Sequence, residues 1–188
     1  MGRVLFITGG VRSGKSAFAE YYAKELYTKY NSSHLIYIAS GVAFDEEMKS
    51  RITRHKQDRE VSEIEWITVE LADEVPTKLD KFQNNSIVLW DCITTWLSNV
   101  LYKTQGLNKI NRLNQIEHHL NEFKQQIISW KGQDIVVILV SNEVLDEQLS
   151  DFSEVNLYRQ ILGDLHQWIV AISDETYEID YSLKRQWK

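Results

Sequence analysis

The octet Gly9-Gly10-Val11-Arg12-Ser13-Gly14-Lys15-Ser16 decides the fold of this chain. It follows the apolar run VLFI at residues 4–7 and precedes the stretch AFAEYYA at residues 17–23, which favours a helix. Every fixed position fits the phosphate-binding pattern G-x-x-x-x-G-K-[ST], in the order strand, loop and helix that this pattern requires. We therefore expect the octet to bind the phosphates of a nucleoside triphosphate. The alternative is a glycine-rich turn without a ligand.

Each residue type in the octet suits phosphate. Gly9, Gly10 and Gly14 allow backbone conformations that a Cβ atom would obstruct, so the N–H groups of the loop can turn inward around phosphate oxygens. Lys15 supplies a positive charge and is a candidate catalytic residue. Ser16 opens a helix whose N-terminal dipole favours the same anion, and its hydroxyl is expected to ligate Mg²⁺. ATP or GTP would be the substrate.

Short apolar runs alternate with long helical patterns along the chain, which is typical of a parallel sheet covered by helices. We expect strands near residues 3–8, 34–40, 65–70, 86–90, 134–141 and 176–181. Helices are expected at residues 15–30, 45–59, 72–82, 94–103, 109–130 and 154–173. The only proline, Pro76, lies in the weakest of these helices, which is expected to begin or break there. The predicted fold class is α/β and P-loop NTPase-like, with a mostly parallel central sheet flanked by helices.

Composition narrows the class of protein. The 188 residues suffice for one well-buried domain, residues 1–188, and the composition, 43% hydrophobic and 26% charged, is that of a globular chain. A net charge of −6 argues against a nucleic-acid partner, because phosphate backbones recruit basic surfaces. The longest apolar run, residues 135–140, is far shorter than the roughly 20 residues of a membrane helix.

Cys92 is the only cysteine, so no intramolecular disulfide can form. The N-terminal apolar run is interrupted after a few residues by Thr8 and is no signal-peptide core. We therefore expect a cytoplasmic protein with no membrane insertion.

A second element of a nucleotide site should follow the phosphate loop, namely an acidic residue at the C-terminal end of a buried strand. The run SIVLW at residues 86–90 is followed by Asp91, whose carboxylate should emerge where open α/β sheets bind ligands. We expect Asp91 to ligate Mg²⁺, directly or through water. The alternative is a helix N-cap, a role that Asp often takes.

A histidine lies in a basic helical pattern at residues 45–59. Acidic residues precede basic ones along it, the order that the helix dipole prefers. Helical spacing brings His55 and Arg59 onto one stripe, with Arg51 one turn before His55. A neutral imidazole there could attack a phosphorus atom while the cations stabilise charge on the phosphate oxygens. The alternative is a solvated basic face with an incidental histidine.

Several motifs occur together and in order along residues 3–144. They are the octet with Arg12-Ser13, Tyr37-Ile38-Ala39-Ser40, E-M-x-x-R-I-x-x-H at residues 47–55, Trp66-x-Thr68-x-Glu70, Asp91-Cys92-Ile93-Thr94-Thr95 with Asn99, and Val140-Ser141-Asn142-Glu143-Val144. In this order they resemble the motifs of the bifunctional adenosylcobinamide kinase and adenosylcobinamide-phosphate guanylyltransferase family of cobalamin biosynthesis.

The resemblance implies two reactions in a P-loop fold that assembles into homotrimers. The first phosphorylates the aminopropanol hydroxyl of adenosylcobinamide, and the second transfers GMP from GTP to the resulting phosphate. His55 matches the histidine that the family guanylylates, forming a phosphoramidate with GMP. Besides the octet, the implied nucleotide-binding residues are Ala39, Ser40, Gly41, Lys56, Gln57, Asp58, Arg59, Glu70 and Asp91.

The chain departs from the family pattern at four places. Residues 145–150, LDEQLS, replace a glycine-rich loop, and Glu60 replaces a proline. His166 stands where the family often has asparagine, and Tyr181-Ser182 where it has Ser-Gly. These changes fall in regions expected to shape the corrinoid site or subunit contacts.

We therefore expect a cytoplasmic, homo-oligomeric transferase that uses nucleoside triphosphate and corrinoid substrates with Mg²⁺. One alternative is a P-loop small-molecule kinase without guanylyl transfer. Another is a nucleotide-binding regulatory module without turnover. The sequence leaves open whether ATP or GTP donates the phosphoryl group.

Overall fold

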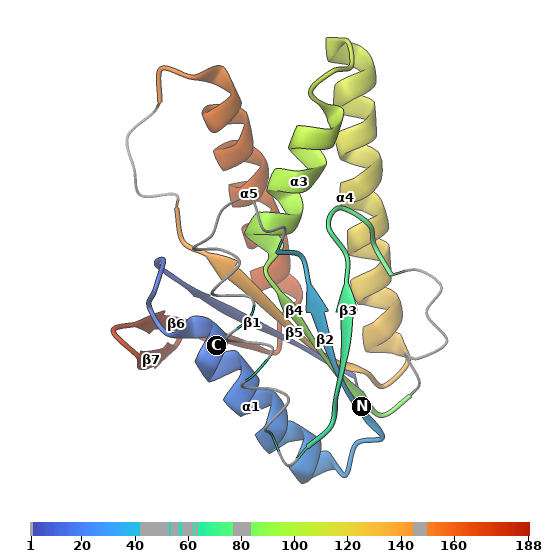
Figure 1. Cartoon of the computed structure of the whole chain (residues 1–188), viewed down its shortest axis with the longest axis vertical. Coiled ribbons are helices and arrows are strands. Elements are labelled where there is room, and N and C mark those ends of the chain that lie inside the picture. Colours follow the sequence, from blue (N-terminus) through green and yellow to red (C-terminus); the bar gives the residue numbers. More distant parts are fainter. Residues whose placement is uncertain are drawn as a thin grey trace.

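A computed structural model describes residues 2–41, 53, 57, 62, 64–76, 84–144 and 150–188. In this part of the chain seven strands form one sheet in the order β3-β2-β4-β5-β1-β6-β7 (Figure 1). All neighbouring strands are parallel except β6 and β7, which form an antiparallel hairpin. The strands are β1 (Arg3–Gly9), β2 (His34–Ala39), β3 (Trp66–Glu70), β4 (Ser86–Asp91), β5 (Val136–Asn142), β6 (Glu175–Asp180) and β7 (Leu183–Gln186).

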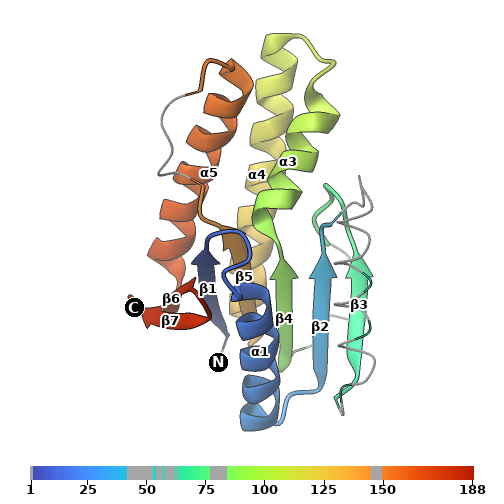
Figure 2. The ribbon, with the colours of Figure 1, turned by 60° about the vertical axis from the view of Figure 1, so that its left-hand side comes forward.

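Helices cover both faces of the sheet. On one face lies α1 (Lys15–Tyr30), whose Ala19, Ala23 and Leu26 are buried against strand residues. The other face is covered by α3 (Ile93–Thr104), α4 (Lys109–Gly132) and α5 (Ser153–Ile172). These three helices extend beyond the carboxyl ends of the strands (Figure 2). Because both faces are covered, the central strands β1, β4 and β5 each contain an unbroken run of buried apolar residues.

An aromatic cluster packs α3 and α4 onto the sheet. The rings of Trp96 in α3 and Phe123 in α4 stack with their centroids 5.0 Å apart, and Trp90 of β4 meets Phe123 at 5.2 Å. All three side chains are fully buried. Large aromatic rings bury more apolar area than any other side chain, so this cluster fixes the helix that follows Asp91.

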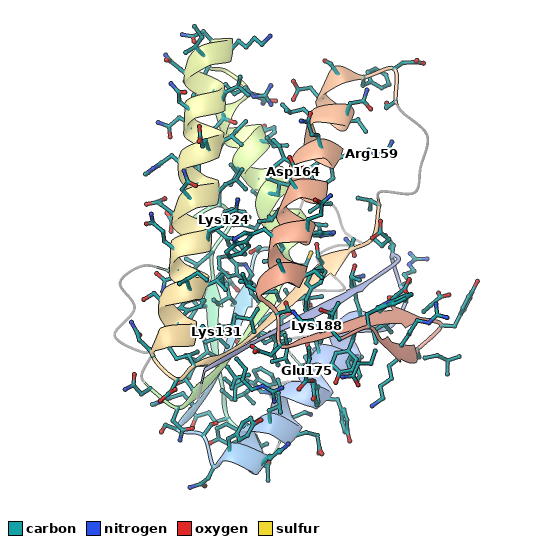
Figure 3. All side chains as sticks on the ribbon, turned by 180° about the vertical axis from the view of Figure 1, so that it is seen from behind. Lys124, Lys131, Arg159, Asp164, Glu175 and Lys188 are labelled. Atoms are coloured by element: carbon teal, nitrogen blue, oxygen red, sulfur yellow. The ribbon has the colours of Figure 1, made fainter. Side chains whose placement is uncertain are left out.

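A buried polar cluster fixes β6 beside β1 and α1. Glu175, at the start of β6 (Figure 3), accepts hydrogen bonds from Arg3 at 2.6 Å, from Tyr22 at 2.6 Å and from Tyr177 at 2.7 Å. A carboxylate with three donors is well satisfied even where water is largely excluded. The cluster therefore holds the C-terminal hairpin in a defined position beside the first strand.

Most elements agree with the sequence-based expectation. The six expected strands are confirmed within two residues at each end, and so are the helices expected at residues 15–30, 94–103, 109–130 and 154–173. The edge strand β7 was not expected. Within the expected helix at residues 45–59, only Thr53 and Gln57 are described, and both are helical. Among the described residues, no helix combines the length and apolar character of a membrane span.

The helix expected at residues 72–82 is wrong for residues 72–76, which are not helical. The backbone carbonyl of Ala72 accepts a hydrogen bond from Asn99 at 2.8 Å, and that of Asp73 accepts one from Trp96 at 3.2 Å. Side chains of α3 thus satisfy carbonyls that a helix would bond internally. Residues 77–82 lie outside the described residues.

His166 lies in the core, which corrects the expectation that this position shapes a substrate or subunit surface. It belongs to α5 and is 6% exposed. Its Nε2 atom is hydrogen-bonded to the hydroxyl oxygen of Ser141 in β5, 2.7 Å away, and its ring centroid is 5.1 Å from that of Phe6. Burial lowers the pKa of His166 to about 4, so the imidazole is neutral at pH 7.

We predict that His166 makes the folded state sensitive to acid. In the unfolded chain its pKa is about 6.5, so between pH 6.5 and 4 the unfolded state binds a proton that the folded state does not. Stability is therefore complete above pH 6.5 and is lost as the pH falls toward 4, by about 2 kcal/mol between pH 8 and pH 5. Urea unfolding at the two pH values should show this loss in the parent.

His166→Asn should reduce the difference between the two pH values, because Asn does not titrate. The control is His118→Asn, a change at an exposed histidine on α4, which should leave the parental difference intact. Equal pH dependence in the parent and His166→Asn would contradict the prediction.

Candidate functional site

The octet forms the loop that joins β1 to α1, as expected. Gly9 ends the strand, and Gly14 precedes the helix with a left-handed φ of 94°. Lys15 is 7% exposed, and its Nζ donates a hydrogen bond to the carbonyl of Gly10 at 3.0 Å. The lysine is thus folded back over the loop, where a bound phosphate would lie.

Backbone hydrogen bonds hold the loop from two sides. The N–H of Glu143, just after β5, donates to the carbonyl of Gly9 at 2.9 Å. The N–H of Ser182, between β6 and β7, donates to the carbonyl of Ser13 at 2.8 Å. The sequence-based assignment included neither residue. The polar run after the apolar strand at residues 136–140 could have indicated Glu143. The sequence marks Ser182 only as a departure from the family pattern, and nothing in it indicates the contact of Ser182 with the loop.

The close approach of β6 explains the glycine at position 9. A Cβ atom there would lie 2.2 Å from the carbonyl oxygen of Ile179, and φ is +153°. A Cβ at Gly14 would lie 2.8 Å from the hydroxyl of Ser182, whereas one at Gly10 would have open space. The first and last glycines of the loop are thus required by its neighbours.

Strand register brings the other candidates to the same edge of the sheet. Ala39 of β2 is level with both Glu70 of β3 and Asp91 of β4, and Asp91 is level with Val140 of β5. These residues lie at the carboxyl ends of parallel strands, the edge from which the phosphate loop also leaves. Parallel pairing thus gathers candidates that lie far apart in the sequence.

The Asp91 side chain is half-buried, and its Oδ2 accepts a hydrogen bond from the hydroxyl of Tyr37 at 3.0 Å. Cys92, not Asp91, is the N-cap residue of α3, and its side chain makes no capping hydrogen bond. The structure therefore does not support the alternative role of Asp91 as a helix cap. The Tyr37 hydroxyl instead orients a carboxylate at the edge of the sheet.

Ser16 and Asp91 fit Mg²⁺ by the nature of their donors. Both present oxygen atoms from half-buried positions, one at the N-terminus of α1 and one at the end of β4. Among the described residues, no group of three or more His, Cys, Asp or Glu side chains could form a metal cage. Mg²⁺ at nucleotide sites needs no such cage, because waters and phosphates supply most of its ligands.

The turn after β2 is held by buried hydrogen bonds. The Ser40 hydroxyl accepts one from the indole of Trp90 at 2.8 Å, and its carbonyl accepts one from Asn99 at 3.0 Å. The Ser40 side chain thus links neighbouring strands, while Gly41 is exposed. Contact of this turn with nucleotide stays a prediction, as does that of the exposed Glu70.

The expected nucleophile lies outside the described residues, together with Lys56, Asp58 and Arg59. Of the implied nucleotide-binding residues in that segment, Gln57 is helical and exposed. The role of His55 as the nucleophile therefore stays a prediction from the sequence.

Comparison with known proteins gives a consistent family. The model of the cobinamide kinase / cobinamide phosphate guanyltransferase family matches residues 5–181. The bifunctional adenosylcobalamin biosynthesis protein CobU of Escherichia coli (strain K12) is 30% identical over 178 residues, 93% of each chain. The protein of the same name from Salmonella typhimurium is 29% identical over 179 residues, again 93% of each chain. A solved KaiC-like protein from Pyrococcus horikoshii OT3 has a TM-score of 0.46 at 12% identity, covering 94% of this chain and 70% of its own.

We predict that Gly9→Ala destabilises the protein, whereas Gly10→Ala does not disturb its packing. The new methyl group at position 9 meets a backbone carbonyl that cannot rotate away, and at position 10 it meets open space. Forcing an extra carbon into a packed site costs about 1–3 kcal/mol. Thermal unfolding of the two variants measures the difference, and equal unfolding temperatures would show that β6 does not press on the loop.

Proposed function

Because the chain belongs to the cobinamide kinase / cobinamide phosphate guanyltransferase family, we propose that it catalyses both reactions of that name. It would phosphorylate the aminopropanol hydroxyl of adenosylcobinamide and then transfer GMP from GTP to the resulting phosphate. The observation that carries the proposal is the phosphate loop at residues 9–16, built at the carboxyl edge of the sheet within a family match that spans residues 5–181.

The kinase step depends on the phosphate loop. The acceptor hydroxyl oxygen attacks the γ-phosphorus, the bond to the bridging oxygen breaks, the nucleoside diphosphate leaves, and the hydroxyl proton passes to solvent. The loop N–H groups and Lys15 stabilise negative charge on the phosphate oxygens. Lys15 is already held over the loop by its hydrogen bond to Gly10, so little reorientation is needed.

Ser16 and Asp91 are the proposed Mg²⁺ ligands. The hydroxyl of Tyr37 donates a hydrogen bond to one oxygen of the Asp91 carboxylate, which fixes how this carboxylate is held at the end of β4. Bound there, Mg²⁺ would neutralise charge on the β- and γ-phosphates. This chain would contribute two oxygen donors, one at the N-terminus of α1 and one at the end of β4.

The guanylyl step is proposed to use His55. Its unprotonated ring nitrogen attacks the α-phosphorus of GTP, the bond from this phosphorus to the β-bridging oxygen breaks, and pyrophosphate leaves. A phosphate oxygen of cobinamide phosphate then attacks the same phosphorus, and the phosphorus–nitrogen bond breaks. The histidine is thereby regenerated. Lys56 and Arg59 are proposed to stabilise the phosphate charge.

Sheet order favours separate regions for the two steps. Asp91 ends β4, two strands from β1, whereas Glu70 ends β3, four strands from β1. With strands about 4.8 Å apart, Glu70 is roughly 19 Å from the phosphate loop across the sheet. We infer that Glu70 and the turn at residues 39–41 serve the GTP of the second step, while the octet serves the phosphoryl donor.

We also propose that the chain works in the cytoplasm as a homo-oligomer, as the family resemblance implies. The single cysteine, Cys92, supports a reducing compartment. Light scattering of the purified protein would measure the assembly directly.

Asp91→Asn should reduce the kinase rate by at least roughly tenfold and raise the Mg²⁺ concentration that it requires, because the amide carries no charge for the metal. The fold should persist, since the Tyr37 hydroxyl can donate to the amide oxygen. Initial rates across a Mg²⁺ titration measure both effects. Asp151→Asn, at an exposed position, is the control and should behave as the parent. An unchanged Mg²⁺ profile for Asp91→Asn would restrict Asp91 to a structural role.

His55→Ala should separate the two reactions. With GTP labelled at the α-phosphate, the parent should acquire label that survives base and is lost in acid, as a phosphoramidate does. The variant should acquire none, yet should still phosphorylate adenosylcobinamide, because the octet carries that step. Mass analysis of protein and corrinoid measures both outcomes, with His118→Ala as the control.

Label retained in His55→Ala would assign the nucleophile elsewhere. An unlabelled parent that still phosphorylates adenosylcobinamide would identify a kinase without guanylyl transfer. A parent that neither takes label nor turns over would favour a regulatory module.

A further inference from the structure

The tip of the C-terminal hairpin contacts the loop at residues 9–16 through Ser182, which lies beside both Ser13 and Gly14. β6 and β7 are joined by two residues, Tyr181 and Ser182, and the last cross-strand pair is Asp180 with Leu183. The N–H of Ser182 donates to the carbonyl of Ser13 at 2.8 Å. The hairpin tip is thereby held at a fixed distance from the loop proposed to bind phosphate.

The tip is built from residues that do not favour its backbone conformation. Tyr181 has a φ of 46° and Ser182 a φ of 62°, both left-handed. Two-residue hairpin turns of this kind favour Asn-Gly, and a bulky residue with positive φ is uncommon. The Tyr181 side chain is 88% exposed, so its own burial does not offset the strain. Strained residues of this kind concentrate at ligand-binding positions.

The orientation of a nucleotide on the loop follows from its fixed points. On the proposed function, the γ-phosphate of a bound nucleotide would lie with Lys15 and Ser16 and toward Asp91, on the side of β1 occupied by β5 and β4. The loop N–H groups hold the α- and β-phosphates. The nucleoside would then leave the loop on the opposite side of β1, where β6 and β7 lie.

We propose that Tyr181 is the platform on which the purine base of the P-loop nucleotide stacks. The inference rests on the proposed function, because it requires a triphosphate on the octet. An exposed aromatic ring at the end of a rigid hairpin offers a face to the base, and stacking of this kind tolerates either purine. Tyr181 therefore binds ATP and GTP alike and adds affinity for the nucleoside without contacting phosphate.

The test compares two ligands that both carry a triphosphate chain, of which only one carries a nucleoside. A non-hydrolysable ATP analogue and inorganic tripolyphosphate are titrated with Mg²⁺ by calorimetry. Tyr181→Gly removes the ring and relieves the turn, because glycine adopts positive φ freely. It should bind the ATP analogue roughly 5- to 100-fold more weakly and tripolyphosphate unchanged. Tyr181→Phe, which keeps the ring, should match the parent for both ligands.

Tyr102→Gly serves as the control for loss of an exposed aromatic side chain, since Tyr102 is 67% exposed on α3. It should match the parent in its affinity for both ligands. Unchanged affinity of Tyr181→Gly for the ATP analogue would overturn the stacking role. Equal weakening of both ligands would also overturn it, because the ring would then act through the shape of the loop.

Lys15→Ala distinguishes this inference from the function on which it rests. Loss of both ligands in Lys15→Ala supports the phosphate site, whatever the result at Tyr181. If Lys15→Ala binds both ligands as the parent does, the phosphate-site assignment fails, and the stacking role fails with it.

Discussion

The parallel pairing of β1 with both β5 and β6 is the constraint on which the site depends. This pairing puts the end of β1 between β5 and β6. Glu143, which follows β5, and Ser182, which follows β6, each donate a backbone hydrogen bond to the loop. The carbonyl of Ile179 passes so close to Gly9 that only glycine fits. The loop thus owes its shape to neighbours as much as to its own glycines. A loop held in place by its neighbours is preorganised, which is what the proposed binding of phosphate requires.

The sequence predicts best the strands whose side chains are buried on both faces of the sheet. Strands β1, β4 and β5 are buried on both faces, so each appears as an unbroken apolar run bounded by polar residues. Strand β7, LKRQ, is exposed along its whole length and exists because β6 offers an unpaired edge. The sequence pattern of these four residues does not by itself predict a strand. The non-helical path of residues 72–76 likewise depends on the side chains of Asn99 and Trp96, which come from another element.

The candidate site divides in the same way. The octet and Asp91 could be predicted because each is adjacent to a recognisable strand, and a local pattern carries the chemistry. Ser182 could not, because its contact with Ser13 joins residues 169 positions apart and uses only backbone atoms. His166 shows the opposite error. Its departure from the family pattern suggests a substrate site or subunit contact, but the side chain is hydrogen-bonded to Ser141 inside the core.

Charge at the carboxyl edge of the sheet explains why the proposed chemistry needs a cation. Asp91, Glu70 and Glu143 end or follow strands at this edge, in a chain whose net charge is −6. A triphosphate on the loop would be repelled by carboxylates at this edge unless positive charge intervenes, and the repulsion is greatest for the carboxylates nearest the loop. Lys15 and the N-terminus of α1 balance part of the phosphate charge. On the proposed function, Ser16 and Asp91 would hold Mg²⁺, which would supply further positive charge, and the Asp91 carboxylate would then act as a ligand rather than as a source of repulsion.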